Sequence, residues 1–446
     1  MRAGIFLFLG LVAAGTLDAG SALSITAATD HGYYREGAAD DVYVEAHIVV
    51  TPSAEGAVPT TPRNIALVVD RSGSMAGQPM QMLRQALTAT LGSLADRDTV
   101  AVVAFGSEVE TVMEAQHTDQ TRDLAALLAQ LEPAGGAALY DALNQGAAQL
   151  RRYAGPNTVS HLVLITDGPP TKGPRELDDF SRLAEVFARE GIAISTIGLG
   201  EDFDEDLLAT LARVGNGRFR YVRDPAQLPE ILQAELAPLQ TAVAHDAVLT
   251  VEFKPYCDDV KSHGWEPATV QAATVTYLFP YLFADQDVTV LASGQVRAMS
   301  ANGVLREAIR IRLRWREAQD DQEHEVVQSL PLRFLTEDRG IRESVNASVF
   351  RTAASAAITE GMQDAIERLD KNDFRGALRA LRRARNEARD LNYDLEDEQI
   401  AGAIRRLDTY LAEVQSRGLN QLDRKVLRSG LFNQFESPMA GDSAGN

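Results

Sequence analysis

Four mainly apolar segments, separated by helical patterns, constrain the fold of this chain more than any other feature of its sequence. They cover residues 65–69, 100–105, 161–165 and 192–197. Apolar runs of this length are typical of strands that are covered on both faces, as in parallel sheets. Between the runs, apolar residues recur at helical spacing. Strands that alternate with amphipathic helices predict a doubly wound, mostly parallel α/β sheet, which we place at residues 62–237.

The segments on either side of this α/β region have a different pattern. Residues 247–253, 288–291 and 309–315 alternate apolar and polar positions, which is typical of strands with one solvated face. Residues 23–61 contain similar strands before the α/β region. We therefore expect an antiparallel β-sandwich built from residues 23–61 and 238–340, with the α/β domain inserted into it.

A helical region is expected next, at residues 341–430, followed by a flexible polar tail at 431–446. Its three helical patterns cover 350–368, 374–391 and 397–416, and the second is rich in arginine within a chain of net charge -20. Two interpretations of this basic helix stay open. It is either a solvated face packed against the acidic α/β domain or a surface that docks a partner.

The amino-terminal segment has the pattern of a targeting signal. Arg2 precedes an apolar run at residues 5–14, and small residues follow at 19–22. The run is shorter than the roughly 20 residues that span a bilayer, so we interpret residues 1–22 as a secretory signal peptide. The mature protein is expected to be exported, to the periplasm or the extracellular space, without membrane insertion.

Composition excludes several classes of function. A chain with 63 acidic and 43 basic residues is repelled by nucleic acid, so we expect no nucleic-acid partner. Its single cysteine, Cys257, allows no disulfide within the chain and no cysteine-based metal cluster. There is no GxxxxGK[ST] motif for nucleotides and no G-x-S-x-G motif for a serine hydrolase.

Oxygen-bearing side chains gather where two of the expected strands end. Asp70, Ser72 and Ser74 follow the first strand in an Asp-x-Ser-x-Ser pattern, and Asp167 follows the third. Ligands of open α/β sheets bind at the carboxyl ends of the strands, near the point where strand order reverses. Carboxylate and hydroxyl oxygens suit Mg²⁺, with Mn²⁺ as the alternative ion. Because few protein ligands are present, a position remains for the carboxylate of a partner.

Three sequence blocks carry a family resemblance. They are residues 64–75, which end in Asp-Arg-Ser-Gly-Ser-Met, residues 135–143, which begin with Gly-Gly-Ala-Ala-Leu-Tyr-Asp, and residues 164–168, Leu-Ile-Thr-Asp-Gly. Together they resemble a von Willebrand factor A-like domain with a metal-ion-dependent adhesion site. The flanking regions are similar to exported bacterial members that have a split β-sandwich and a carboxyl-terminal helical extension. The resemblance implies that Asp70, Ser72, Ser74 and Asp167 bind the metal ion.

One position departs from the pattern of the family. A threonine whose hydroxyl binds the ion usually follows the Gly-Gly pair, and here that position is Ala137. We expect a non-enzymatic binding protein that presents a divalent cation to an Asp or Glu of a protein partner, in adhesion or complex assembly. The alternatives are a metal-free scaffold that binds through the β-sandwich or the basic helices, and a hydrolase that uses Ser72. The sequence predicts no oligomeric state.

Overall fold

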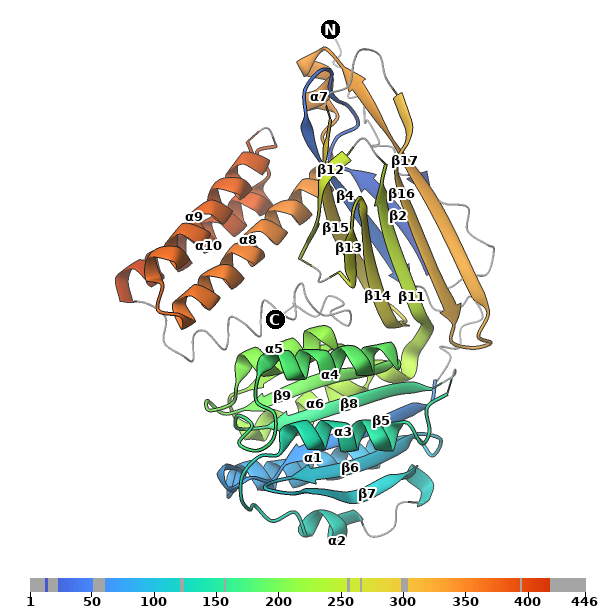
Figure 1. Ribbon diagram of the computed structural model, residues 1–446, viewed down its shortest axis with the longest axis vertical. Helices are drawn as coiled ribbons and strands as arrows, with labels where there is room; N and C mark the ends of the chain where they lie inside the picture. The colour runs from blue at the N-terminus through green and yellow to red at the C-terminus, as the bar shows by residue number, and fades with distance from the viewer. Residues whose placement is uncertain are drawn as a thin grey trace.

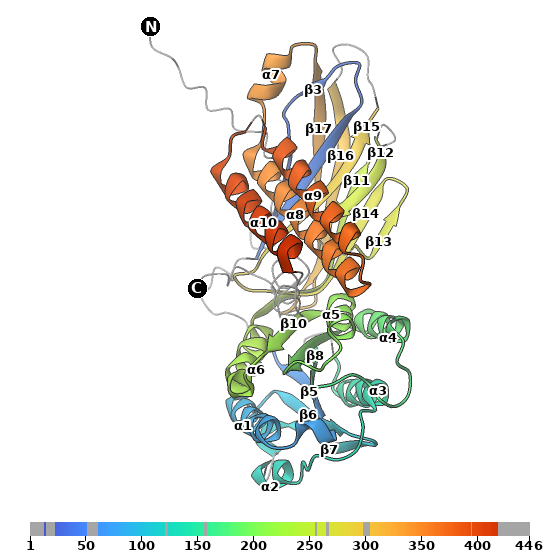
Figure 2. The same ribbon diagram turned by 90° about the vertical axis from the view of Figure 1, so that its left-hand side faces the viewer.

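The structure is a computed structural model that describes residues 13–14, 23–50, 61–120, 124–155, 158–254, 257–264, 267–297, 304–393 and 395–417. An α/β domain forms one end of the molecule and a β-sandwich the other, with a layer of helices beside the sandwich (Figures 1 and 2). The predicted tail, most of the predicted signal peptide and residues 51–60 lie outside the described residues. No helix within the described ranges combines the length and apolar character needed to cross a membrane.

The α/β domain has a six-stranded central sheet in the order β10-β9-β8-β5-β6-β7. These strands are β5 (Arg63–Asp70), β6 (Thr99–Phe105), β7 (Val109–His117), β8 (Val159–Thr166), β9 (Ile192–Leu199) and β10 (Asn216–Val222). All neighbouring pairs are parallel except β6 and β7. Every residue of β5, β6, β8 and β9 is buried, as the apolar runs predict. The chain adds β6 on one side of β5 and β8 on the other, so strand order reverses at β5.

Helices cover both faces of this sheet, which confirms the doubly wound prediction. They are α1 (Gln78–Ser93), α2 (Leu124–Ala129), α3 (Leu139–Leu150), α4 (Leu177–Arg189), α5 (Glu205–Val214) and α6 (Leu228–Leu236). Alternate residues of β5 face opposite sides. Leu67 packs in the cluster that holds α1 and α6, whereas Val68 packs in the cluster that holds α3, α4 and α5. Short 3₁₀ turns occur at Gly73–Met75, Thr118–Gln120, Pro225–Gln227 and Pro238–Thr241.

Two sheets form the β-sandwich. One has the order β1-β2-β4-β15-β12, with β1 (Ala13–Ala14), β2 (Leu23–Thr29), β4 (Asp40–Val50), β15 (Asp287–Val296) and β12 (Cys257–His263). The other has the order β13-β14-β11-β16-β17-β3, with β13 (Thr269–Gln271), β14 (Thr274–Phe283), β11 (Ala242–Phe253), β16 (Val304–Glu317), β17 (Glu323–Leu335) and β3 (Tyr34–Arg35). Strand β4, which precedes the α/β domain in the chain, pairs with β15, which follows it. The α/β domain is therefore an insertion in the sandwich.

The sandwich is antiparallel apart from the short parallel pair of β17 with β3. Its core takes alternate residues from both sheets, as the period-two pattern predicts. Cys257 is buried in this core as a free thiol.

Four helices end the described chain: α7 (Asp338–Glu343), α8 (Ala347–Asp370), α9 (Phe374–Leu391) and α10 (Glu398–Arg417). The last three share an apolar core rich in alanine. A Cβ at Gly361 would collide with Cβ of Ala384, so the glycine permits the close crossing of α8 and α9. Helix α8 docks on the sandwich, where Thr352 donates a hydrogen bond of 2.5 Å to Glu45.

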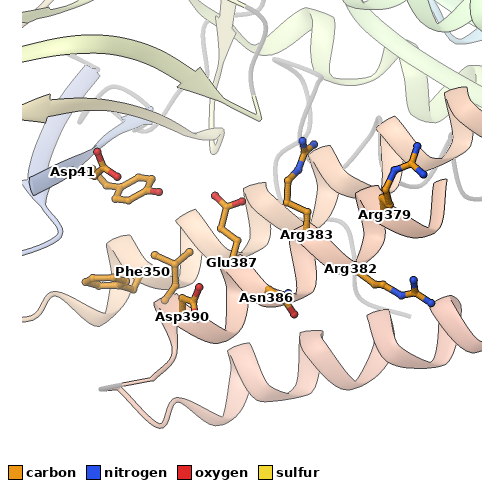
Figure 3. Close-up of a pocket in the computed structure, with 10 residues that line it drawn as sticks. Asp41, Phe350, Arg379, Arg382, Arg383, Asn386, Glu387 and Asp390 are labelled. Carbon is orange, nitrogen blue, oxygen red and sulfur yellow. The ribbon is translucent and has the colours of Figure 1, made fainter. Parts of the chain in front are cut away.

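A groove of about 780 Å³ lies between α9 and β4 (Figure 3). Arg379 and Arg383 lie toward one end, and Phe350 and Asp390 toward the other. Several arginines of α9 already have acidic partners within the helical layer. Arg383 lies 3.3 Å from Asp364 of α8, and Arg385 and Arg389 lie 3.4 and 3.1 Å from Asp408 of α10.

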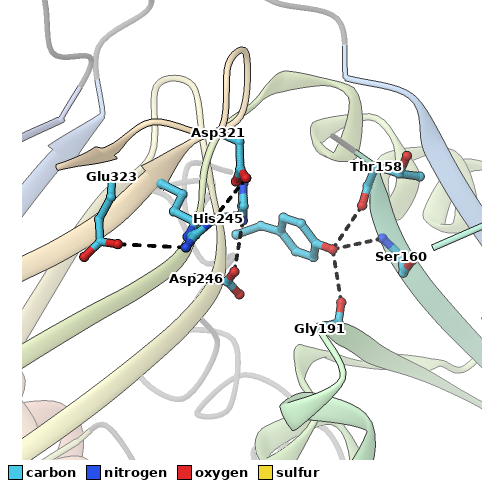
Figure 4. A network of polar contacts seen from close by, with 9 residues as sticks. Thr158, Ser160, Gly191, His245, Asp246, Asp321 and Glu323 are labelled. Atoms are coloured by element: carbon cyan, nitrogen blue, oxygen red, sulfur yellow. Dashed lines mark hydrogen bonds and ion pairs between the residues drawn. The ribbon is translucent and has the colours of Figure 1, made fainter. Parts of the chain in front are cut away.

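Tyr281 of β14 joins the sandwich to the α/β domain, where its partners are Thr158, Ser160 and Gly191 (labelled in Figure 4). Its hydroxyl accepts a hydrogen bond from the Ser160 amide at 3.2 Å. The hydroxyl proton is shared between two acceptors, the Gly191 carbonyl at 3.0 Å and the Thr158 carbonyl at 3.2 Å. All three partners lie at the amino ends of β8 and β9. The joint is therefore at the edge of the central sheet opposite the carboxyl ends of its strands.

Candidate metal site at the carboxyl edge of the central sheet

Asp70 is the last residue of β5, and its side chain is fully buried beside the point where strand order reverses. Its Oδ1 accepts a hydrogen bond of 2.7 Å from the Ser72 amide, and its Oδ2 accepts one of 2.5 Å from the hydroxyl of Thr166. The turn after β5 and the end of β8 therefore hold both carboxylate oxygens. Asp70 stands where the sequence predicts it, held by two neighbouring loops.

Ser72, Ser74 and Asp167 continue from Asp70 as one chain of polar contacts. The hydroxyls of Ser72 and Ser74 lie 3.0 Å apart, and Ser74 donates a hydrogen bond of 2.7 Å to Oδ1 of Asp167. Because the single hydroxyl proton of Ser74 is directed to Asp167, Ser72 is the donor to Ser74. The structure thus brings together all four residues that the sequence suggests. Whether they bind a metal ion remains a prediction.

Burial disfavours the charged forms of both carboxylates. It raises the pKa of Asp70 above the usual value of an aspartate, against the opposing effect of the hydrogen bonds from Thr166 and Ser72. Burial also raises the pKa of Asp167, and the negative charges of Asp70 and Asp202 add to this shift. A cation between the carboxylates would offset their repulsion. Asp202 is exposed, but it is close enough to contribute to the field at the site.

Residue 137 turns away from this site. The side chain of Ala137 is only 3% exposed and packs in the apolar cluster that contains Phe105 and Leu139. Its amide donates a hydrogen bond of 2.6 Å to the hydroxyl of Thr171. Sequence reasoning missed both Thr166 and Thr171. The position of Thr166 at the end of an apolar strand, directly before Asp167, is a signal that could have indicated it.

The donor set fits a hard, partly hydrated cation. Two carboxylates and two hydroxyls are the oxygen ligands that Mg²⁺ prefers, and Mg²⁺ keeps several water molecules when it binds to proteins. Within the described ranges, no three His, Cys, Asp or Glu side chains gather in a group that could hold a metal ion. Four candidate ligands leave positions in the octahedral shell of Mg²⁺ that water or a partner can fill.

The contacts of His161 bear on the hydrolase alternative. Its Nε2 lies 2.9 Å from the hydroxyl of Ser195, and that hydroxyl donates a hydrogen bond of 2.6 Å to Glu235. Because the serine proton is directed to Glu235, histidine does not act as its acceptor, unlike the base in a catalytic triad. His161 is fully buried, and burial lowers its pKa to about 4. This network lies inside the protein, and its serine is not Ser72.

The fold and the arrangement at this edge define a class of domain. A doubly wound sheet with Asp-x-Ser-x-Ser after its first strand and Thr-Asp-Gly after the neighbouring strand is a von Willebrand factor type A domain. Residues 64–234 match this domain family. The chain therefore contains such a domain, and domains of this type are generally non-enzymatic modules of protein interaction that commonly bind a divalent ion such as Mg²⁺.

Curated relatives match this part of the chain. The protein sll0103 of Synechocystis is 26% identical over 208 residues, which cover 47% of this chain and 49% of the relative. Human inter-alpha-trypsin inhibitor heavy chain H2 is 29% identical over 165 residues, which cover 35% of this chain and 17% of the relative. The chain thus spans half or less of the length of these relatives.

Solved structures extend the similarity beyond the A domain. The ArnB paralog VWA2 from Sulfolobus acidocaldarius matches with a TM-score of 0.64 and 17% identity, over 94% of this chain and 100% of that chain. A von Willebrand factor type A protein from Catenulispora acidiphila matches with a TM-score of 0.65 and 19% identity, over 85% and 89% of the two chains. At this level of identity the likeness establishes the fold alone. It confirms the predicted combination of an α/β domain, antiparallel sheets and a helical region.

Proposed function

We infer that this chain is an exported, non-enzymatic protein-binding module that presents a divalent cation to an acidic group of a partner. The observation that carries the proposal is the chain of contacts from Asp70 through Ser72 and Ser74 to Asp167. It lies at the carboxyl ends of β5 and β8, where strand order reverses and where ligands of such sheets bind.

Each residue has a distinct role in this proposal. The hydroxyls of Ser72 and Ser74 bind the ion directly, and the carboxylates of Asp70 and Asp167 bind it directly or through water. When bound, the ion supplies a positive charge with a free position for an oxygen ligand. A protein partner fills that position with an Asp or Glu carboxylate, and the surrounding loops provide specificity. The amino-terminal pattern at 1–22 supports export to the periplasm or the extracellular space.

Calorimetric titration of Mg²⁺ and Mn²⁺ into the metal-stripped mature protein tests the proposal. We expect saturable binding at one site, and its loss in Asp70→Ala. Asp287→Ala is the matched control, because it removes an exposed aspartate of the sandwich whose described ion pair is with His47 at 3.6 Å. Equal binding by Asp70→Ala and the wild type would show that the site is wrong. Absence of binding in all three proteins would contradict the proposed function.

A second candidate is a metal-free scaffold that binds partners through the sandwich or the basic helices. The groove between α9 and β4 favours it, because Arg379, Arg382 and Arg383 line one wall. The ion pairs of Arg383 with Asp364, and of Arg379 with Asp373 at 3.9 Å, weaken the case, because they neutralise part of that charge. If no divalent ion binds, this surface becomes the leading candidate for partner docking.

A further inference from the structure

Three loops at the carboxyl edge of the sheet close into a ring. The loop after β5 is tied to the loop before α3, because the Gly73 amide donates to the Gly135 carbonyl at 3.1 Å. The loop after β8 returns to the loop before α3, where the Ala137 carbonyl accepts from the amides of Thr171 and Lys172 at 2.9 and 3.1 Å. The bond from Ser74 to Asp167 completes the ring.

Thr171 lies on the third side of this ring, four positions after Asp167. Its hydroxyl accepts a hydrogen bond of 2.6 Å from the Ala137 amide, which fixes the oxygen against the loop before α3. The packing there is close, since a Cβ at Gly136 would collide with this oxygen. A hydroxyl oxygen has two lone pairs, so one remains for a second partner. Thr171 is exposed as a residue, and its hydroxyl oxygen is fixed in position by a part-buried hydrogen bond.

We propose that the Thr171 hydroxyl is a further oxygen ligand of the divalent cation, supplied by the loop after β8. The proposal rests on the function inferred above. It follows from two observations at the same loop. First, the side chain of Ala137 packs in the apolar core and carries no oxygen. Second, the hydroxyl of Thr171 lies beside the backbone of Ala137, where it accepts a hydrogen bond from the Ala137 amide. The ion would then have one hydroxyl ligand from the loop after β8, Thr171, in addition to those from the loop after β5, Ser72 and Ser74.

A purely structural role for Thr171 makes a different prediction. Helix α3 begins at Leu139, and the N-cap residue before it, Ala138, provides no side-chain hydrogen bond to the helix. A hydroxyl that only binds the Ala137 amide would stabilise this end of the helix without touching the ion. In that case, removing the Thr171 hydroxyl would lower the melting temperature of the metal-free protein. It would not change the relative affinities for Mg²⁺ and Cd²⁺.

Replacement of the oxygen by sulfur separates the two roles. Soft thiolate ligands favour Cd²⁺ over Mg²⁺, so Thr171→Cys should lose Mg²⁺ affinity and gain Cd²⁺ affinity if residue 171 contacts the ion. Lys172→Cys is the matched control, because it places a thiol on the next residue. The native Cys257 is buried, and burial raises its pKa to about 11, so it contributes little thiolate. Thr171→Val removes the oxygen, and Thr171→Ser keeps it.

The measurements are calorimetric titrations with Mg²⁺ and Cd²⁺, the ultraviolet absorption of a cadmium–thiolate bond, and the melting temperature of each metal-free variant. We expect Thr171→Val to weaken Mg²⁺ binding by about tenfold or more. A loss of about tenfold is typical when a residue that only supports a metal ligand is removed, so loss of a direct ligand should cost at least as much. Thr171→Ser should retain affinity, and only Thr171→Cys should show the cadmium–thiolate absorption.

Unchanged Mg²⁺ affinity in Thr171→Val, or no cadmium–thiolate signal in Thr171→Cys, overturns the role of Thr171. If Asp70→Ala still abolishes binding in that case, the proposed function stands and only this inference fails. If the wild-type protein binds no Mg²⁺, both fail together.

Discussion

Ser74 and Asp167 are 93 positions apart in the chain, yet the hydroxyl of one donates a hydrogen bond of 2.7 Å to the carboxylate of the other. The bond joins the loops that follow β5 and β8. Ser74 is exposed, Asp167 is half-buried, and Asp70 behind them is fully buried. The polar groups therefore form a gradient from the core to solvent, with Ser74 at its exposed end.

The raised pKa values of the two aspartates predict a pH-dependent affinity for Mg²⁺. The ion binds the charged carboxylates, so protons compete with it. The affinity for Mg²⁺ should reach its maximum at pH values above the raised pKa values of Asp70 and Asp167. It should fall as the pH falls through those values. Because burial raises both values, the loss should begin at a higher pH than for ordinary aspartates. Calorimetry from neutral to mildly acidic pH, in buffers of different ionisation enthalpy, measures the affinity and the protons released.

An affinity that does not change over that pH range would contradict this prediction. The control is the heat of proton release in Asp70→Ala, which should disappear together with binding. Binding should also stabilise the folded state, by about 2.7 kcal/mol at an Mg²⁺ concentration of about 100 times Kd. Thermal unfolding with and without Mg²⁺ therefore provides an independent check of the same site.

Thr166→Val should weaken the site without changing its shape. The hydroxyl of Thr166 donates to Oδ2 of Asp70 in the buried interior, so its loss leaves a carboxylate oxygen without this partner. We expect the free energy of unfolding to fall by about 1–3 kcal/mol and the pKa of Asp70 to rise further. Affinity for Mg²⁺ at neutral pH should fall by about tenfold. Urea unfolding and calorimetry measure the two effects.

Thr90→Val is the matched control for this experiment. Thr90 is also buried, but its hydroxyl has no hydrogen-bond partner among the described residues. Its replacement should leave stability unchanged or slightly higher and should not alter Mg²⁺ binding. Equal effects of the two substitutions would contradict a specific role for Thr166.

Much of the fold could be predicted from the sequence because the central strands are buried on both faces. Strands β5, β6, β8 and β9 appear as mainly apolar runs, a pattern that amphipathic helices and surface loops rarely produce. The sequence does not predict the edge strands β7 and β10, because polar residues on their exposed faces interrupt the apolar run. In β14, Tyr277 packs in the core of the sandwich, whereas Tyr281 reaches the α/β domain, and the sequence pattern does not distinguish the two.

The candidate site was predictable only in part, for a related reason. Asp70 and Asp167 follow apolar strands directly, so strand topology alone brings them to one edge. The position of Thr171 depends on how the loop after β8 folds back on Ala137, and local sequence does not determine such a contact. The same holds for the side chain of Ala137, because its burial in the core follows from the path of the loop and not from its neighbours in sequence.

His161 should make the folded state sensitive to acid. Burial lowers its pKa from 6.5 to about 4, so the unfolded chain binds this proton at a higher pH than the folded protein does. The stability that the neutral imidazole provides is complete above about pH 6.5 and is lost as the pH falls toward 4, by about 3 kcal/mol in total. His161→Gln should reduce this slope between neutral pH and the lowered pKa. Urea unfolding at several pH values tests it, and an identical slope in both proteins would contradict it.

Tyr281→Phe should loosen the joint between the sandwich and the α/β domain while leaving the candidate metal site intact. The substitution removes the hydroxyl that binds the Ser160 amide and the Gly191 carbonyl, and both backbone groups lie at the amino ends of strands. We expect a loss of about 1–3 kcal/mol in the free energy of unfolding, because polar groups in the joint lose a partner.

Mg²⁺ affinity should not change, because the candidate site lies at the opposite ends of the same strands. Urea unfolding and calorimetry measure the two quantities, with Tyr393→Phe as the control, since Tyr393 is 82% exposed. A fall in Mg²⁺ affinity in Tyr281→Phe alone would instead indicate that the joint and the candidate site are coupled through β8.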